Sequence, residues 1–176
     1  MNTATPVDLR LLVKDVPDFP KKGIVFKDIT PLLADPKAFG AAIDAMAAPY
    51  QGKGIRLVAG IESRGFLFGA PLAMRLGKGF IPVRKPGKLP RERISASYAL
   101  EYGVDALEVH RDAIGKGQRC ILVDDVLATG GTIAACAQLV RKLGGEVVGI
   151  AFLMELTFLM GREKLEDEKV FSVVQY

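Results

Sequence analysis

The sequence is short of the residues on which several classes of protein depend. Its 176 residues include two cysteines, one histidine and no tryptophan. Cys120 and Cys136 are too few for a disulfide framework or a four-ligand zinc site, so we expect reduced core thiols in a cytoplasmic protein. The single histidine, His110, has no serine or cysteine in a recognisable nucleophile setting, which leaves a catalytic triad unsupported.

Long apolar runs and the common nucleotide-binding loops are also missing. The longest apolar stretches have the length of a core strand, well short of the about 18 residues that a membrane span needs. Residues 1–8 lack the basic and apolar stretches of a signal peptide. No segment reads Gly-x-x-x-x-Gly-Lys-Ser/Thr, and no Gly-x-Gly-x-x-Gly follows a strand. We therefore expect no membrane contact and a different kind of phosphate site, if there is one.

The overall composition is that of one globular domain, residues 1–176. Hydrophobic residues make up 49% and charged residues 25%, a balance that supports an ordinary core. The formal charge of +4 and the pI near 9.1 favour anionic partners. Charge alone does not distinguish nucleic acid from a polyphosphate substrate.

The most informative segment is residues 121–133, which read Ile-Leu-Val-Asp-Asp-Val-Leu-Ala-Thr-Gly-Gly-Thr-Ile. The apolar residues 121–123 predict a buried strand that ends at Asp124 and Asp125, and a helix over 133–143 follows. Ligands of open α/β sheets bind at the carboxyl ends of strands. The small residues before the helix favour a phosphate, because backbone N–H groups can approach it closely. The segment therefore predicts a site for a phosphate beside a sugar diol; a plain turn with solvated carboxylates is the alternative.

Two further segments suit a polyphosphate. Residues 60–65 follow a predicted strand and precede a helix, and Arg64 offers a guanidinium fork for a phosphate, although it could simply be exposed. Residues 84–93 carry five cations among prolines and a glycine. Nucleic-acid surfaces usually interleave aromatic residues with such charges, and none lies between Arg84 and Ile94. We expect a mobile cover over a polyphosphate, against the alternative of a solvated loop.

Two single residues remain ambiguous from the sequence alone. Glu101 is a lone carboxylate between apolar and aromatic residues, and it could be catalytic or merely an exposed strand residue. Phe26 follows an apolar stretch, and it could belong to the core or form a stacking platform for a planar base. Residue chemistry alone favours the core for Phe26.

The rest of the chain predicts strands that alternate with helices. Expected helices are residues 7–16, 37–48, 66–76, 133–143 and 157–166, and expected strands are residues 57–60, 80–83, 97–102, 107–110, 121–123, 146–154 and 170–174. This alternation indicates the α/β class with a mostly parallel sheet and right-handed crossovers.

Residues 120–132 resemble the phosphoribosyl pyrophosphate (PRPP) signature of the type I phosphoribosyltransferases. Further segments resemble the adenine branch of that family: residues 19–20, 23–29, 62–66, 84–90, 97–103, 155–156 and 161–165. The resemblance runs from about Pro17 to Val174, with Lys27 standing where arginine is frequent. It implies a type I phosphoribosyltransferase fold: a mostly parallel central sheet flanked by helices, a small N-terminal hood (about 1–34), a core (about 35–176) and a flexible loop (about 85–106).

The resemblance also implies a reaction. The 5-phosphoribosyl group passes from PRPP to adenine, which gives AMP and pyrophosphate, with Mg²⁺ held mainly by substrate and water rather than directly by side chains. A cytoplasmic homodimer that binds neither nucleic acid nor membrane is implied as well.

Site residues follow from the same resemblance, position by position. Those for the 5′-phosphate are Ala128, Thr129, Gly130, Gly131 and Thr132, and those for the ribose hydroxyls are Asp124 and Asp125. Those for pyrophosphate are Arg64, the backbone of Glu62 and Ser63 (joined by a cis peptide in the family), Arg84, Lys85 and Lys88. Those for adenine are Phe26 as the platform, Val126 on the opposite face, the backbone of Val25 and Lys27, and Glu101, which accepts a proton or hydrogen bond at the imidazole side. Leu127 and Tyr102 are implied as further substrate-binding residues.

Three alternatives stay open. A related enzyme could accept a 6-oxopurine such as hypoxanthine, guanine or xanthine. A PRPP-sensing regulator on the same fold would need a DNA-reading module, and the residues before the first sheet strand already match the hood. A catalytically inactive scaffold is disfavoured by the acidic pair and Glu101.

Overall fold

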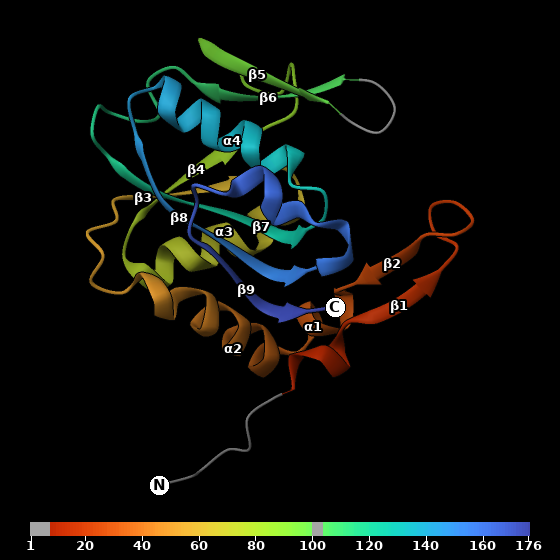
Figure 1. The fold of residues 1–176 in the computed structure, drawn as a ribbon. Helices are drawn as coiled ribbons and strands as arrows, with labels where there is room; N and C mark the ends of the chain where they lie inside the picture. Colours follow the sequence, from red (N-terminus) through yellow and green to blue (C-terminus); the bar gives the residue numbers. More distant parts are fainter. Residues whose placement is uncertain (1–7, 100–103) are drawn as a thin grey trace, which may run out of the picture.

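A five-stranded parallel sheet forms the middle layer of the molecule (Figure 1). The computed structural model describes residues 8–99 and 104–176. Across the sheet the strands are β4 (Gly79–Val83), β3 (Leu57–Ile61), β7 (Arg119–Leu127), β8 (Glu146–Glu155) and β9 (Val170–Gln175). Every neighbouring pair is parallel, so the predicted α/β class and parallel sheet are confirmed.

Helices cover both faces of this sheet. Helices α2 (Pro36–Ala47) and α3 (Arg64–Leu76) pack on one face, and α4 (Gly131–Lys142) packs on the other (Figure 1). Within β7, Ile121 and Val123 join the apolar cluster with α2 and α3, whereas Leu122 joins the cluster with α4. This alternation explains why the strand reads as a continuous apolar run.

The predicted helix starts were close to those observed. Asp35 caps α2, because its carboxylate accepts hydrogen bonds from the N–H groups of Lys37 (2.8 Å) and Ala38 (3.1 Å), and Pro36 occupies the first turn. Helices α3 and α4 each begin two residues before the predicted start. None of the helices in residues 8–99 and 104–176 is both long and apolar enough to cross a bilayer.

The predicted helix over residues 7–16 is wrong. Within its described part, a 3₁₀ turn η1 (Leu9–Leu12) leads into strand β1 (Lys14–Pro17), which pairs antiparallel with β2 (Val25–Asp28). Strand pairing outweighs the short helical pattern here, because the pattern had too few residues to form a stable helix alone. A single turn, α1 (Thr30–Ala34), follows β2, and η2 (Ala48–Tyr50) extends α2.

The predicted C-terminal helix over residues 157–166 is wrong too. Two 3₁₀ segments, η3 (Thr157–Leu159) and η4 (Gly161–Leu165), stand in its place. They are separated by Met160, whose φ of 52° is left-handed and ends the first segment. Contacts of Gly161 with a distant turn, described below, account for the break.

The predicted pair of strands beyond the basic segment is confirmed within the described residues. Strands β5 (Arg93–Ala99) and β6 (Val104–His110) form an antiparallel pair that lies across α4 (Figure 1). Residues 100–102 of the predicted strand lie outside the described ranges.

Candidate active site

The acidic pair lies where β7 extends past its neighbour β3. The prediction that the strand ends at the acidic pair is wrong, because β7 continues to Leu127 in register with β8. Pairing with β3 stops at Val123 opposite Gly60. From Asp124 onward β7 therefore has a strand on one side only, and the open side is close to the start of α3.

Arg64, the first residue of α3, reaches the acidic pair. Its Nε lies 3.0 Å from Asp125 Oδ2, and the Asp125 side chain is only 3% exposed. Apart from this ion pair, Asp125 Oδ2 has no hydrogen-bond donor among residues 8–99 and 104–176. Asp124 Oδ1 accepts a hydrogen bond of 2.9 Å from the Asp125 N–H. The pair thus keeps acceptor capacity that a ligand hydroxyl could use.

The electrostatics of the pair follow from its burial. Burial raises the pKa of Asp124 well above its usual value, and the neighbouring charge of Asp125 raises it further. Burial also raises the pKa of Asp125, while the Arg64 guanidinium opposes that rise. The buried Asp125 and the half-buried Asp124 would both be stabilised by a partner that supplies positive charge or hydroxyl donors.

Gly65 allows α3 to approach the acidic pair. A methyl group at this position would lie 2.8 Å from the Val123 carbonyl oxygen and 3.0 Å from Asp124 Oδ1. Any larger residue would push the helix start away from β7, so the glycine fixes where Arg64 can reach.

The predicted phosphate-binding turn leads directly from β7 into α4. We define it as residues 128–131. Gly130 has a φ of +79°, and no side chain in the described part of the protein caps the helix behind it. The first N–H groups of α4 are therefore available to an anion, which the positive end of the helix also attracts. Thr129 is exposed at this turn.

A cis peptide joins Glu62 to Ser63 immediately before α3, as the resemblance implies. Around Glu62 the structure gathers the predicted pyrophosphate-binding cations. Arg84 Nε lies 3.2 Å from its carboxylate, the Lys85 N–H donates to it at 3.0 Å, and Lys88 Nζ pairs with it. Partial burial would raise the pKa of Glu62, but these hydrogen bonds outweigh it and hold the pKa below its usual value. The basic segment over residues 84–93 is thus held against the Glu62 carboxylate.

Phe26 is not part of the core, contrary to what residue chemistry alone favoured. It belongs to neither apolar cluster of the described residues, and it is half-buried. The Phe19 ring packs edge-on against it, with centroids 5.2 Å apart, and the Arg64 guanidinium carbon lies 5.0 Å from its centroid. A flat aromatic face therefore adjoins the acidic pair through Arg64.

The Lys27 side chain contacts other residues of the protein. Its Nζ lies 2.6 Å from Asp15 Oδ1 and 3.9 Å from the centroid of Tyr176, the C-terminal residue, and the side chain is 13% exposed. Figure 1 shows the C-terminus beside the β1–β2 pair. The Lys27 ammonium is thus engaged within the protein, so a base contact at this residue would have to use its backbone.

An apolar hollow of about 530 Å³ adjoins the same strand. Val25 and Lys27 line it together with Leu156, Phe158 and Leu159. The last two follow β8 in the chain, in the segment expected to be a regular helix, so sequence periodicity concealed their part in the site. Phe19 and Tyr176 were also missed, although Phe19 lies within a segment that carried the resemblance.

The remaining predicted residues lie near these groups. Val126 is half-buried and packs against the α2–α3 cluster, whereas Leu127 is buried in the α4 cluster. Lys85 Nζ also hydrogen-bonds the Tyr98 hydroxyl at 2.7 Å. Glu101 and Tyr102 lie outside the described residues.

The donor chemistry of the site suits a metal ion that arrives with a ligand. In residues 8–99 and 104–176, no three His, Cys, Asp or Glu side chains are grouped as a metal cage. Asp124 and Asp125 nevertheless supply carboxylate oxygens, the donors that Mg²⁺ prefers.

Known proteins are similar to this chain over nearly its whole length. Residues 32–175 match the family model described as a phosphoribosyl transferase domain. The chain is 57% identical over 169 residues to adenine phosphoribosyltransferase of Caldanaerobacter subterraneus, which covers 96% of this chain and 98% of the relative.

Solved structures agree with this. The structure of adenine phosphoribosyltransferase from Thermoanaerobacter pseudethanolicus superposes with a TM-score of 0.94 at 57% identity, covering 96% of this chain and 98% of that one. The Saccharomyces cerevisiae enzyme, solved with an imino-altritol bisphosphate and adenine, superposes with a TM-score of 0.88 at 45% identity, covering 94% and 96%.

Proposed function

Because this chain belongs to the phosphoribosyltransferase family, and within it to the adenine phosphoribosyltransferases, we propose that it transfers the 5-phosphoribosyl group from PRPP to adenine. The products are AMP and pyrophosphate. The observation that carries the proposal is the acidic pair, which lies between an uncapped helix N-terminus and the half-buried Phe26 ring.

The phosphoribosyl end of PRPP occupies the turn and the acidic pair. Backbone N–H groups of residues 128–132 and the Thr129 and Thr132 hydroxyls bind the 5′-phosphate. Asp124 and Asp125 accept hydrogen bonds from the ribose 2′- and 3′-hydroxyls. The free acceptor capacity of Asp125 Oδ2 supports this assignment.

The pyrophosphate end lies against Arg64 and the backbone of Glu62 and Ser63. Arg84, Lys85 and Lys88 add positive charge. Arg84 and Lys88 now pair with Glu62, so pyrophosphate would exchange one anionic partner of these cations for another. The two cations are 33% and 49% exposed, but Glu62 is only 10% exposed. The exchange would therefore leave a mostly buried carboxylate with fewer partners, which opposes pyrophosphate binding.

The base lies on the Phe26 ring with Val126 on its other face. The backbone of Val25 and Lys27 reads its edge, and Leu127 and Tyr102 are further substrate contacts. Engagement of the Lys27 ammonium by Asp15 and Tyr176 supports a backbone role. Glu101 exchanges a proton or hydrogen bond at the imidazole side of adenine, where an acid–base group contributes typically about 10²–10⁴-fold.

This arrangement suits a reaction without a covalent intermediate. Departure of pyrophosphate from C1 leaves positive charge on the ribose ring, and the carboxylates of Asp124 and Asp125 stabilise that charge. Magnesium, bound mainly through substrate and water, would neutralise charge on the leaving pyrophosphate. Enclosure of the site excludes water, which would otherwise capture the sugar.

A pyrophosphate-release assay with PRPP, Mg²⁺ and each purine base tests the proposal. We expect turnover with adenine and little with hypoxanthine, guanine or xanthine. Preference for a 6-oxopurine would reject adenine as the substrate. Filter binding with duplex DNA at moderate salt tests the regulator alternative, and sedimentation velocity tests the homodimer that the resemblance implies.

Phe26→Ala is expected to weaken adenine binding selectively. Loss of a stacking partner costs about 1–3 kcal/mol per base, so the KM for adenine should rise roughly 5- to 150-fold. The KM for PRPP should rise less, because Phe26 lies on β2 whereas the phosphate-binding turn lies between β7 and α4. Steady-state kinetics with each substrate varied in turn measure both constants.

Phe26→Tyr is the matched control, since it keeps the ring and should behave like the original protein. An equal rise of both constants in Phe26→Ala would contradict the role of a base platform.

A further inference from the structure

The backbone at Gly161 packs directly against the phosphate-binding turn. A methyl group at Gly130 would overlap the carbonyl oxygen of Gly161, and one at Gly161 would overlap the carbonyl oxygen of Ala128. The same methyl at Gly161 would lie 2.9 Å from Leu127 Cδ1. The chain at residue 161 is therefore in direct contact with both sides of the turn, and its position limits where residues 128–130 can lie.

One buried carboxylate holds the chain at this position. Glu155, at the end of β8, is 4% exposed and sits in register with Leu127, the residue before the turn. Its two oxygens accept hydrogen bonds from Arg162 Nε (2.6 Å) and from a terminal guanidinium nitrogen of Arg162 (2.7 Å). This bidentate pair fixes both the distance and the plane of the guanidinium. Arg162 directly follows Gly161, so the pair determines where Gly161 lies.

The carboxylate is also held on its other side. Ser172 Oγ (2.8 Å) and Gln175 Nε2 (3.2 Å), both on β9, donate to Glu155 Oε2. Arg162 donates in addition to the Val170 carbonyl oxygen at 3.1 Å. These hydrogen bonds, led by those from Arg162, hold the pKa of Glu155 below its usual value. Glu155 therefore stays ionised at neutral pH and joins the ends of β8 and β9 to the segment that contacts the turn.

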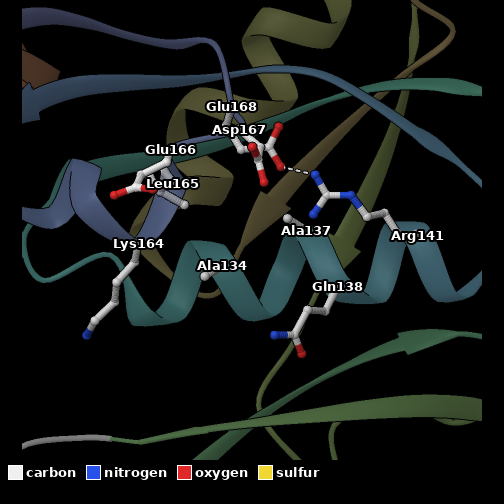
Figure 2. A pocket seen from close by; sticks show the side chains of 9 residues that line it. All are labelled: Ala134, Ala137, Gln138, Arg141, Lys164, Leu165, Glu166, Asp167 and Glu168. Carbon is white, nitrogen blue, oxygen red and sulfur yellow. Dashed lines mark hydrogen bonds and ion pairs between the residues drawn. The ribbon is translucent and has the colours of Figure 1, made fainter.

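The far end of the same segment is attached to α4. Leu165 is 4% exposed and packs in the α4 cluster, and Arg141 on α4 pairs with Glu168 (Figure 2). Figure 2 shows the segment lying along the helix. Residues 161–168 thus connect β8 to the helix whose N-terminus receives the phosphate.

We propose that Arg162 and Glu155 are positioning residues for the 5′-phosphate: through Gly161 they hold the turn over residues 128–131 in its binding conformation. The inference rests on the proposed function and extends it to two side chains that do not themselves contact substrate. Loss of Arg162 leaves the buried Glu155 carboxylate without its main partner, so some loss of stability is expected beside the effect on the turn.

Arg162→Ala tests this proposal through a split between substrates. Misplacement of a binding group by about 1 Å can cost about 100-fold, so we expect the KM for PRPP and the Kd for AMP to rise about 10- to 100-fold. The KM for adenine at saturating PRPP should change by less than about twofold. Arg162→Lys, which keeps the charge but not the bidentate geometry, should recover part of the loss.

Arg75→Ala is the matched control. Arg75 forms an ion pair of 2.7 Å with Asp44, and both side chains are more than half exposed. Removal of this pair should leave both KM values unchanged, because it joins α3 to α2 away from the turn.

Gly161→Ala tests the same contact without touching the ion pair, and it serves if Arg162→Ala does not fold. It should produce the same selective loss of PRPP and AMP binding. Gly40→Ala on α2, where an added methyl meets nothing within 4 Å, is its control. Circular dichroism and thermal melts confirm that each variant is folded.

The proposal is overturned if Arg162→Ala and Gly161→Ala leave the KM for PRPP within about twofold of the original, or if both KM values rise together. Failure of the proposed function is distinct, since it would appear as no turnover of adenine and PRPP by the unmodified protein.

Discussion

Asp124→Asn is expected to lower kcat/KM for PRPP by about 10²–10³-fold and to raise the thermal unfolding midpoint. The activity falls because a carboxylate beside the ribose is replaced by a neutral amide. Stability rises because the pKa of Asp124 is raised by burial and by Asp125, so its ionised form is disfavoured in the folded protein. A carboxyl group with a raised folded-state pKa destabilises the fold as pH increases past its unfolded value of about 3.9.

Thermal melts at intervals of about one pH unit between pH 4 and 8 measure the predicted change in stability. Steady-state kinetics at neutral pH measure the predicted loss of activity. Asparagine keeps an oxygen that can accept the Asp125 N–H, so the local backbone should persist. Each kcal/mol gained should raise the midpoint by about 2–4 °C, and the gain should shrink toward pH 4. Asp44→Asn, at a half-exposed position away from the site, is the control. A lower midpoint at neutral pH would contradict the assigned electrostatics.

Arg64→Gln is expected to lower kcat/KM for PRPP by a similar factor, about 10²–10³-fold, and to shift its pH profile. Arg64 is assigned to pyrophosphate, and its charge also opposes the effect of burial on Asp125. Without that charge the pKa of Asp125 rises further. Because the ionised carboxylate accepts the ribose hydroxyls, the acid limb of log(kcat/KM) should move to higher pH.

A pH–rate profile separates the two roles of Arg64. In Arg64→Lys the cation remains near Asp125, so the acid limb should stay close to its original position while pyrophosphate binding weakens. Arg75→Gln removes an exposed guanidinium from the same helix and should change neither. If the acid limb of Arg64→Gln stayed in place or moved to lower pH, Asp125 would not be the group that must be ionised.

Local chemistry made much of this fold predictable. The Asp35–Pro36 pair marked the start of α2, and the apolar run before Asp124 marked β7. Both signals depend only on neighbouring residues. The extent of β7 was missed because two adjacent carboxylates resemble the start of a turn, whereas pairing with β8 extends the strand to Leu127.

Contacts between distant segments could not be predicted from periodicity. The spacing of apolar residues over 157–166 fits a helix, yet Gly161 packs against Ala128 and Gly130, and Met160 adopts a left-handed conformation. Likewise, Phe26 reads as a core residue, and its exposure depends on how β2 pairs with β1. Family resemblance supplied the hypothesis that its ring supports the base, because the resemblance carries tertiary information that a single segment lacks.

The pairing register of β2 with β1 determines both which backbone groups face the base and which side the Phe26 ring lies on. Within residues 8–99 and 104–176, β2 pairs only with β1, with Phe26 opposite Val16 and Lys27 opposite Asp15. If main-chain groups of residues 25 and 27 identify the base, exchanging their side chains leaves its hydrogen-bonding partners as they were. A new base preference would need β2 to slip by one residue, which would also send the Phe26 ring to the opposite face of the hairpin. Base choice and ring stacking can therefore change only together, which makes gradual drift toward another purine difficult.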